Sequence, residues 1–190
     1  MSRGEDPHVD LESLLAYWLG ESEDERTQAI DAHLLGCERC GAELDQLIAL
    51  QASVRRAFAD GQVNAFVSGS FVRRLAEQGM RVHEHLLPHN GSVNCSAAPD
   101  DDLLVARLQA PLDGVDRLDA VFRSSIEADE YRLSDIPFDP RAGEVVMIPK
   151  LAEVRGLPAH DFTVRLVSCR DGSERTVGEY MLHHSPTAGR

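Results

Sequence analysis

The stretch "DAHLLGCERCGAEL", residues 31–44, places three potential metal ligands within a helical pattern of apolar residues. His33 and Cys37 are four residues apart, so both side chains lie on one face of a helix. Cys40 follows about one turn later, where the next helix is expected to begin. Imidazole and thiolate are ligands that zinc prefers in proteins. The spacing therefore predicts three zinc ligands at a turn between two helices.

A fourth ligand is needed to complete a tetrahedral site, and His8 is the best candidate by chain position and ligand type. Two Cys and two His ligands close the coordination sphere, as in structural zinc sites. We therefore expect one structural Zn²⁺, bound by His8, His33, Cys37 and Cys40. The alternatives are two free thiols and histidines with no ligand role.

Apolar residues recur at helical spacing from residue 10 to about residue 79. The pattern predicts four helices. The first carries Leu11, Leu14, Leu15, Trp18 and Leu19 on one face, and the second begins at a capping box formed by Ser22 and Glu25. The third runs from about Glu38 to Ala59, and the fourth, which has a Ser cap and contains Phe71, Val72 and Leu75, ends at Gly79.

After Gly79 the pattern changes to short segments rich in β-branched and aromatic residues, separated by turn clusters. The segments are "VHEHLL", "SVNCSA", "LLVARLQA", "LDAVFRS", "EVVMIP", "DFTVRLVSC" and "VGEYMLHH". Such spacing favours an antiparallel β-sandwich. We expect an α+β protein with a helical domain over residues 1–80 and an all-β domain over residues 81–190. An immunoglobulin-like sandwich is preferred because "LPAHDFTVRL" resembles a corner leading into a strand; a cupin-like barrel is the alternative.

Composition limits the classes of function. A hydrophobic content of 43% and a charged content of 27% are typical of a folded globular protein. No apolar run is long enough to span a bilayer, so we expect a cytoplasmic protein, in which Cys95 and Cys169 are buried free thiols. The net charge of −13 argues against direct nucleic-acid binding, including that of a zinc-finger DNA binder.

The pattern His33-x3-Cys37-x2-Cys40, with His8 upstream in a four-helix unit, resembles the zinc-binding anti-sigma factors of bacteria over about residues 5–80. The resemblance implies a non-catalytic protein that binds a sigma factor of the extracytoplasmic-function type. Such a protein blocks the contact of the sigma factor with core RNA polymerase. It also implies that the four residues hold the zinc and that apolar helix faces meet the sigma factor.

Four short helices expose more apolar surface than they can bury among themselves. The candidate partner-binding residues are Leu15, Trp18, Leu47, Phe58, Phe66, Phe71 and Leu75. The fourth helix follows a connector with Gly and Ser, so we expect it to be free to dock on a partner. The alternative is that most of these side chains are ordinary core residues.

The sequence departs from the redox-sensing members of this family at one position. Those members have a cysteine ahead of the first helix, where this chain has His8. A disulfide between that position and the C-x2-C turn is therefore not available, and only Cys37 and Cys40 could pair locally. Oxidation is not expected to be the main signal.

Some family members carry a metal-binding barrel after the helical domain. His83 and His85 are two residues apart on a predicted strand, and His183 and His184 could approach them from the last strand. A second metal site formed by these four histidines is a weaker hypothesis.

The alternative function is a zinc-dependent hydrolase or another metalloenzyme with an open HxxxCxxC site. Glu38 and Glu43 are near the motif, but acidic residues early in a helix are explained by the helix dipole. A nucleobase deaminase needs H-x-E before P-C-x2-C, whereas here "HEH" follows "CERC" and Gly36 replaces the proline. We therefore expect a protein that is not an enzyme.

Overall fold

The computed structural model describes residues 8–18, 20–170 and 173–186. The chain divides into two compact units, Met1–Arg56 and Ala57–Arg190, here called the helical unit and the β-unit. The sequence-based boundary at residue 80 differs from this division, because residues 57–80 group with the strands. The fourth helix causes this difference, because it packs against strands of the β-unit.

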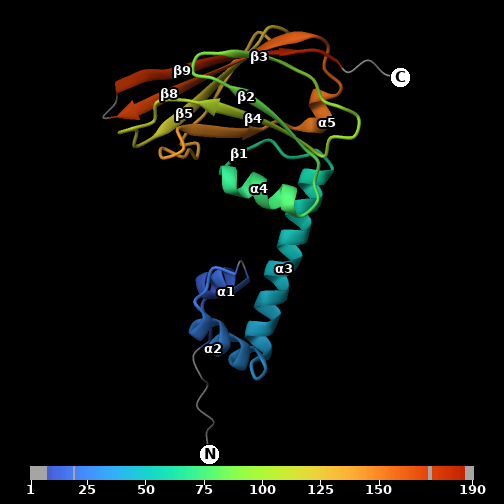
Figure 1. The fold of residues 1–190 in the computed structure, drawn as a ribbon, viewed down its shortest axis with the longest axis vertical. Helices are drawn as coiled ribbons and strands as arrows, with labels where there is room; N and C mark the ends of the chain where they lie inside the picture. Colours follow the sequence, from blue (N-terminus) through green and yellow to red (C-terminus); the bar gives the residue numbers. More distant parts are fainter. Residues whose placement is uncertain (1–7, 19, 171–172, 187–190) are drawn as a thin grey trace, which may run out of the picture. The chain divides into compact units, whose positions relative to one another are not determined.

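The helical unit contains α1 (Leu11–Trp18), α2 (Asp24–Leu34) and most of α3 (Glu38–Ala59) (Figure 1). The bounds of α3 agree with those predicted from the sequence. Leu19, expected on the first helix, lies outside the described residues. The buried apolar side chains of the described part of this unit are Leu14, Ile30 and Cys40. A core this small contributes little hydrophobic stabilisation.

The predicted capping box at the start of the second helix is wrong. Glu23 occupies the cap position of α2 and makes no side-chain cap bond, and the buried Ser22 hydroxyl has no hydrogen-bond partner among the described residues. Asp24 and Glu25 in the first turn still favour this helix start, because negative charge stabilises a helix N-terminus.

The β-unit is built from two sheets (Figure 1). The four-stranded sheet has the order β1 (Ala65–Val67), β7 (Glu144–Ile148), β4 (Leu103–Gln109) and β2 (Val82–Leu87). The five-stranded sheet has the order β3 (Ser92–Cys95), β9 (Ser173–His184), β8 (His160–Arg170), β5 (Leu118–Ser124) and β6 (Glu130–Leu133).

This architecture confirms the α+β class, and neither sheet closes into a barrel within the described strands. The cupin-like alternative is therefore wrong. The expectation of purely antiparallel pairing is also corrected, because β2 pairs with β4 and β3 pairs with β9 in parallel. Each parallel pair joins strands that other elements separate in the chain, and a local hydrophobic pattern does not indicate such a pairing.

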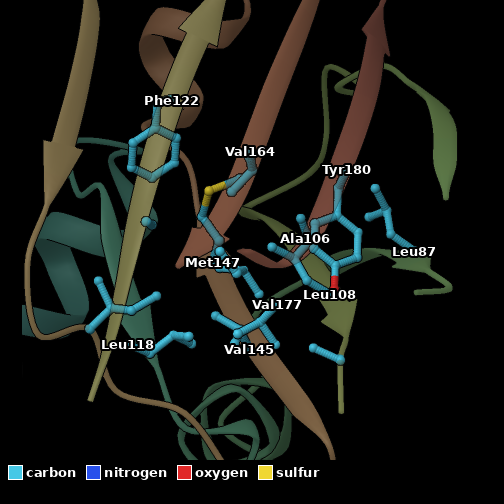
Figure 2. Close-up of a cluster of buried hydrophobic side chains, with 14 of the residues drawn as sticks. Leu87, Ala106, Leu108, Leu118, Phe122, Val145, Met147, Val164, Val177 and Tyr180 are labelled. Atoms are coloured by element: carbon cyan, nitrogen blue, oxygen red, sulfur yellow. The ribbon is translucent and has the colours of Figure 1, made fainter. Parts of the chain in front are cut away.

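The main core lies between the two sheets, and Figure 2 shows part of it. Leu108 and Met147 come from the four-stranded sheet, while Phe122 and Tyr180 come from the five-stranded sheet. The Tyr180 hydroxyl donates a hydrogen bond to the Gln109 carbonyl at 2.6 Å. Burial raises the pKa of Tyr180 to about 12, so the hydroxyl stays a donor at any ordinary pH. This bond joins β9 to β4 across the sandwich.

The fourth helix, α4 (Gly69–Glu77), belongs to the β-unit and is not free to dock on a partner. The expected Ser cap is present, since the Ser68 hydroxyl accepts a hydrogen bond from the Phe71 amide. Val72 and Leu75 are buried in a second cluster with residues of β4 and β7. This packing groups residues 57–80 with the strands. A further short helix, α5 (Leu151–Val154), precedes β8.

Candidate metal centre

The four predicted ligands converge at one point of the helical unit. His8 precedes α1, His33 is in the last turn of α2, Cys37 is in the connecting turn and Cys40 is in the first turn of α3. One ligand atom from each residue lies within 4.8 Å of the other three. The cluster can therefore hold a metal ion.

The distances between the ligand atoms fit a tetrahedral ion. With metal bonds of about 2.0–2.3 Å, neighbouring ligand atoms of a tetrahedron are about 3.3–3.8 Å apart. His33 Nε2 lies 3.3 Å from Cys40 Sγ, and His8 Nδ1 lies 3.3 Å from Cys37 Sγ and 3.7 Å from Cys40 Sγ. These three of the six distances between the ligand atoms match the range, and all six lie within 4.8 Å, so the donor set is compatible with a bound metal ion.

Polar contacts between the helices hold the ligands in place. Asp10 caps α1 by accepting hydrogen bonds from the Ser13 amide and hydroxyl at 2.8 and 2.7 Å. Arg26 of α2 donates to the same Ser13 hydroxyl. The start of α1, three residues after His8, is thereby bound to α2.

A second contact joins the same two helices further along. The Tyr17 hydroxyl donates to Asp31 at 2.6 Å, and this bond raises the pKa of Tyr17. Asp31 lies two residues before His33 on α2. Sequence patterns did not reveal these supporting residues, because the partners lie on different helices and share no spacing.

Electrostatics at Cys40 also favour a cation. Burial is the largest influence and raises the pKa of this thiol, and the neighbouring Cys37 raises it further, while the Val9 backbone lowers it. A buried thiolate without a counter-charge is therefore unfavourable. A bound divalent cation supplies that charge, and coordinating thiols lose their protons.

The structure separates the seven candidate partner-binding residues into two groups. Leu15 and Trp18 on α1 are 43% and 37% exposed, and Leu47 on α3 is half-buried. Trp18 also donates its indole N–H to the Gln51 side chain at 2.8 Å. These three residues leave apolar surface accessible on the helical unit.

The other four candidates lie in the core of the β-unit or pack against it. Phe58 and Leu75 are 5% and 4% exposed, and Phe66 and Phe71 are partly buried against the two main clusters. Packing against the sheets explains why these four positions carry aromatic and aliphatic side chains. Burial of Phe58 and Leu75 argues against their contact with a partner, whereas partner contact by the partly buried Phe66 and Phe71 stays a prediction.

The second histidine cluster does not form. His83 and His85 lie on β2, with ring centroids 4.6 Å apart, and His83 Nδ1 is 3.0 Å from an Asp101 carboxylate oxygen. His183 lies on β9 in the other sheet, 2.7 Å from Asp161. Within the described residues, the only group of three or more potential ligands that converges is the one in the helical unit.

All four cysteines are free thiols. Cys95 is buried, as predicted, and burial raises its pKa. Cys169 is only partly buried, so the prediction of a buried thiol is wrong for this residue, and its sulfur accepts a hydrogen bond from the Arg132 guanidinium at 3.2 Å.

Comparisons with known proteins identify no family. No family model matches the chain. No curated protein matches it either. Among solved structures, the N-terminal domain of phage TP901-1 ORF48 aligns with 56% of this chain and 99% of its own, at 11% identity and a TM-score of 0.36. Among the described residues, no helix has the length and apolar content needed to cross a bilayer.

Proposed function

We propose that this protein is a zinc-binding anti-sigma factor. It would sequester a sigma factor of the extracytoplasmic-function type in the cytoplasm, block association with core RNA polymerase and so regulate transcription. The observation that supports this most is the convergence of His8 with His33, Cys37 and Cys40. This convergence completes the ligand set of the family that the motif resembles.

Zinc is the proposed metal, because two thiolates and two imidazoles in a tetrahedral arrangement suit it best. Four protein ligands leave no coordination position for water or substrate. Cys40 is fully buried as well, which restricts access to the ion. The site therefore suits a structural role, and we propose that the protein is not an enzyme.

The surface of the helical unit supports an interaction function. Among the described residues, seven of the twelve strongly exposed large apolar side chains belong to this unit, which is the smaller one. They are Leu11, Leu15, Trp18, Leu35, Ile48, Leu50 and Val54. Apolar side chains exposed on one small unit are candidates for a protein-binding surface, which a contiguous apolar patch typically marks. The helices that contribute it are those that the metal centre joins.

The experiment uses the purified full chain and a panel of sigma factors of the extracytoplasmic-function type. The zinc-loaded protein should bind one member in a pull-down and inhibit transcription from its promoter. Leu15→Glu should weaken this binding by at least about tenfold, because a charge replaces an apolar contact. Leu86→Glu is the matched control, since Leu86 is an exposed leucine of the β-unit. If no member is bound or inhibited, the proposal is wrong.

A further inference from the structure

The β-unit contains a pocket that is separate from the metal centre. Its volume is about 180 Å³, and its walls are formed by Ala97, Pro99, Val154, Arg155, His184 and Pro186. These residues come from the loop after β3, from α5 and the residue after it, and from the end of β9 and beyond. The pocket adjoins a small buried cluster that contains Ala97, Leu104 and Leu151.

His184 is the unusual residue of this pocket. The residue is only 5% exposed, and neither ring nitrogen makes a hydrogen bond of ordinary geometry among the described residues, although the Leu157 backbone lies close enough to act as a weak hydrogen-bond partner of the ring. A buried polar group without a full hydrogen-bond partner destabilises the fold. Such a group in a pocket wall is explained if a ligand supplies the missing partner.

The imidazole of His184 is neutral at neutral pH. Burial and the neighbouring His160 ring, whose centroid is 5.2 Å away, lower its pKa, while the backbone of Leu157 offsets part of this effect. A neutral imidazole has one N–H, for which a ligand acceptor competes with the Leu157 backbone carbonyl.

Arg155 supplies a positive charge at the same pocket. Its Nη2 donates to the carbonyls of Ala98, Pro99 and Asp101 at 3.2, 3.2 and 2.7 Å. These bonds hold the guanidinium against the loop after β3. All three use the same nitrogen, which leaves Nε and Nη1 for another acceptor. Arg155 is therefore positioned to pair with an anionic group.

The other walls determine what else the ligand must be. Pro99, Val154 and Pro186 are apolar, and no Asp or Glu of the described part of the chain lines the pocket. Two donors favour a ligand group that only accepts hydrogen bonds, as a carboxylate does, even though the charge of Arg155 also interacts with Asp102 outside the pocket walls. The volume is close to that of cavities of about 150 Å³ that hold a benzene molecule.

We propose that this pocket binds a small carboxylate with a compact apolar body, such as an aromatic acid, and that Arg155 and His184 bind its carboxylate. The net charge of −13 opposes anions at a distance, but salt screens such repulsion beyond about 10 Å at 0.1 M. The site is independent of the proposed sigma-factor binding.

The test is a titration of the isotope-labelled full-length protein with benzoate, benzamide and inorganic phosphate, followed by amide NMR. Benzoate should give saturable shifts centred on Ala97, Val154 and Arg155. Benzamide has the same shape without the charge and should bind at least about tenfold more weakly. Phosphate lacks the apolar body and should not saturate the site. Equal affinity for benzoate and benzamide, saturation by phosphate, or no saturable benzoate binding would overturn the proposal.

Variants separate a ligand-binding role of His184 from a structural one. His184→Leu should weaken benzoate binding at least about tenfold while the melting temperature holds or rises, because it removes an unpartnered polar ring. His184→Gln retains a donor and should bind benzoate more tightly than His184→Leu. His183→Gln is the control, since this neighbour pairs with Asp161 and does not line the pocket. Unchanged benzoate affinity in His184→Leu would contradict the assignment.

Discussion

The buried carboxylate of Asp119 on β5 joins β6 and the turn after it to the five-stranded sheet. Asp119 is 1% exposed and accepts hydrogen bonds from Arg132 Nε at 2.8 Å and from the Asp135 amide at 2.9 Å. Asp135 has a φ of 57°, which residues other than glycine seldom adopt, and the bond to Asp119 fixes it there. Burial alone would raise the pKa of Asp119, but these bonds and Arg117 outweigh burial and lower it to about 2.

We expect Asp119→Asn to destabilise the β-unit by about 2 kcal/mol at pH 7 and by less at pH 2. The folded pKa of about 2 lies below the ordinary value of 3.8, so the carboxylate stabilises the fold fully above pH 3.8. This stabilisation is lost as the pH falls through 2. Urea denaturation at both pH values measures the difference, with the exposed Asp129→Asn as control. An equal loss at both pH values would contradict the assigned charge.

At the metal centre, we expect His8→Ala to weaken zinc binding by more than about 100-fold, because it opens a four-ligand site. Competition with a chromophoric chelator measures the affinity, and elemental analysis gives the zinc content of each variant. His89→Ala is the control, since His89 belongs to the β-unit and its Nε2 lies 2.8 Å from the Val177 carbonyl oxygen. Unchanged affinity in His8→Ala would show that the site has only three ligands.

At the scale of elements, α4 explains the composition of the strands beneath it. Val72 and Leu75 of α4 pack against Val105 of β4 and Val146 of β7. The opposite face of the same sheet meets the main core through Leu108 and other residues. β4 is therefore buried on both faces, so it is a nearly continuous apolar segment instead of an alternating one.

Leu75→Ala should destabilise the β-unit by about 2–5 kcal/mol, because it leaves a cavity under α4. Arg73→Ala on the exposed side of the same helix controls for effects on the helix itself. Chemical denaturation of both variants, monitored by near-ultraviolet circular dichroism of the β-unit tyrosines, provides the comparison. If the two variants are equally stable, α4 is not part of this core.

Where the sequence predicted elements well, the residues themselves explain the success. The bounds of α3, β2 and β5 agree with the predicted segments, since each has a clear apolar pattern and ends at turn or cap residues. β6 was missed because all of its residues are exposed, and β1 because it has only three residues.

At the metal centre, helical spacing predicted three ligands, and ligand type with chain position indicated His8. The pocket at His184 had no local signal, since distant segments form it.

At the scale of the molecule, the two units are stabilised by different means. The described part of the helical unit buries three apolar side chains, whereas the β-unit has a large core between its sheets. A structural zinc can supply roughly 10 kcal/mol of folding free energy to a small domain. The helical unit should therefore depend on its metal, and the β-unit should not.

Removing zinc with a strong chelator should unfold α1 and α2 while the β-unit remains folded. Trp18 is the single tryptophan of the chain, so its fluorescence reports on the helical unit alone. We expect its emission to shift to longer wavelengths, while amide NMR signals from β4, β5 and β8 stay in place. Added zinc should reverse the change. An unaltered Trp18 spectrum after complete zinc removal would contradict a stabilising role for the metal.

The parallel pairing of β3 with β9 sets an order of events during protein synthesis. β3 spans residues 92–95, and its partner β9 begins only at Ser173, so the ribosome must make most of the β-unit before the two strands can meet. Contacts in the helical unit are local by comparison and form sooner. The helical unit can thus fold, and its His/Cys cluster can become available to a metal ion, while the sandwich is still incomplete.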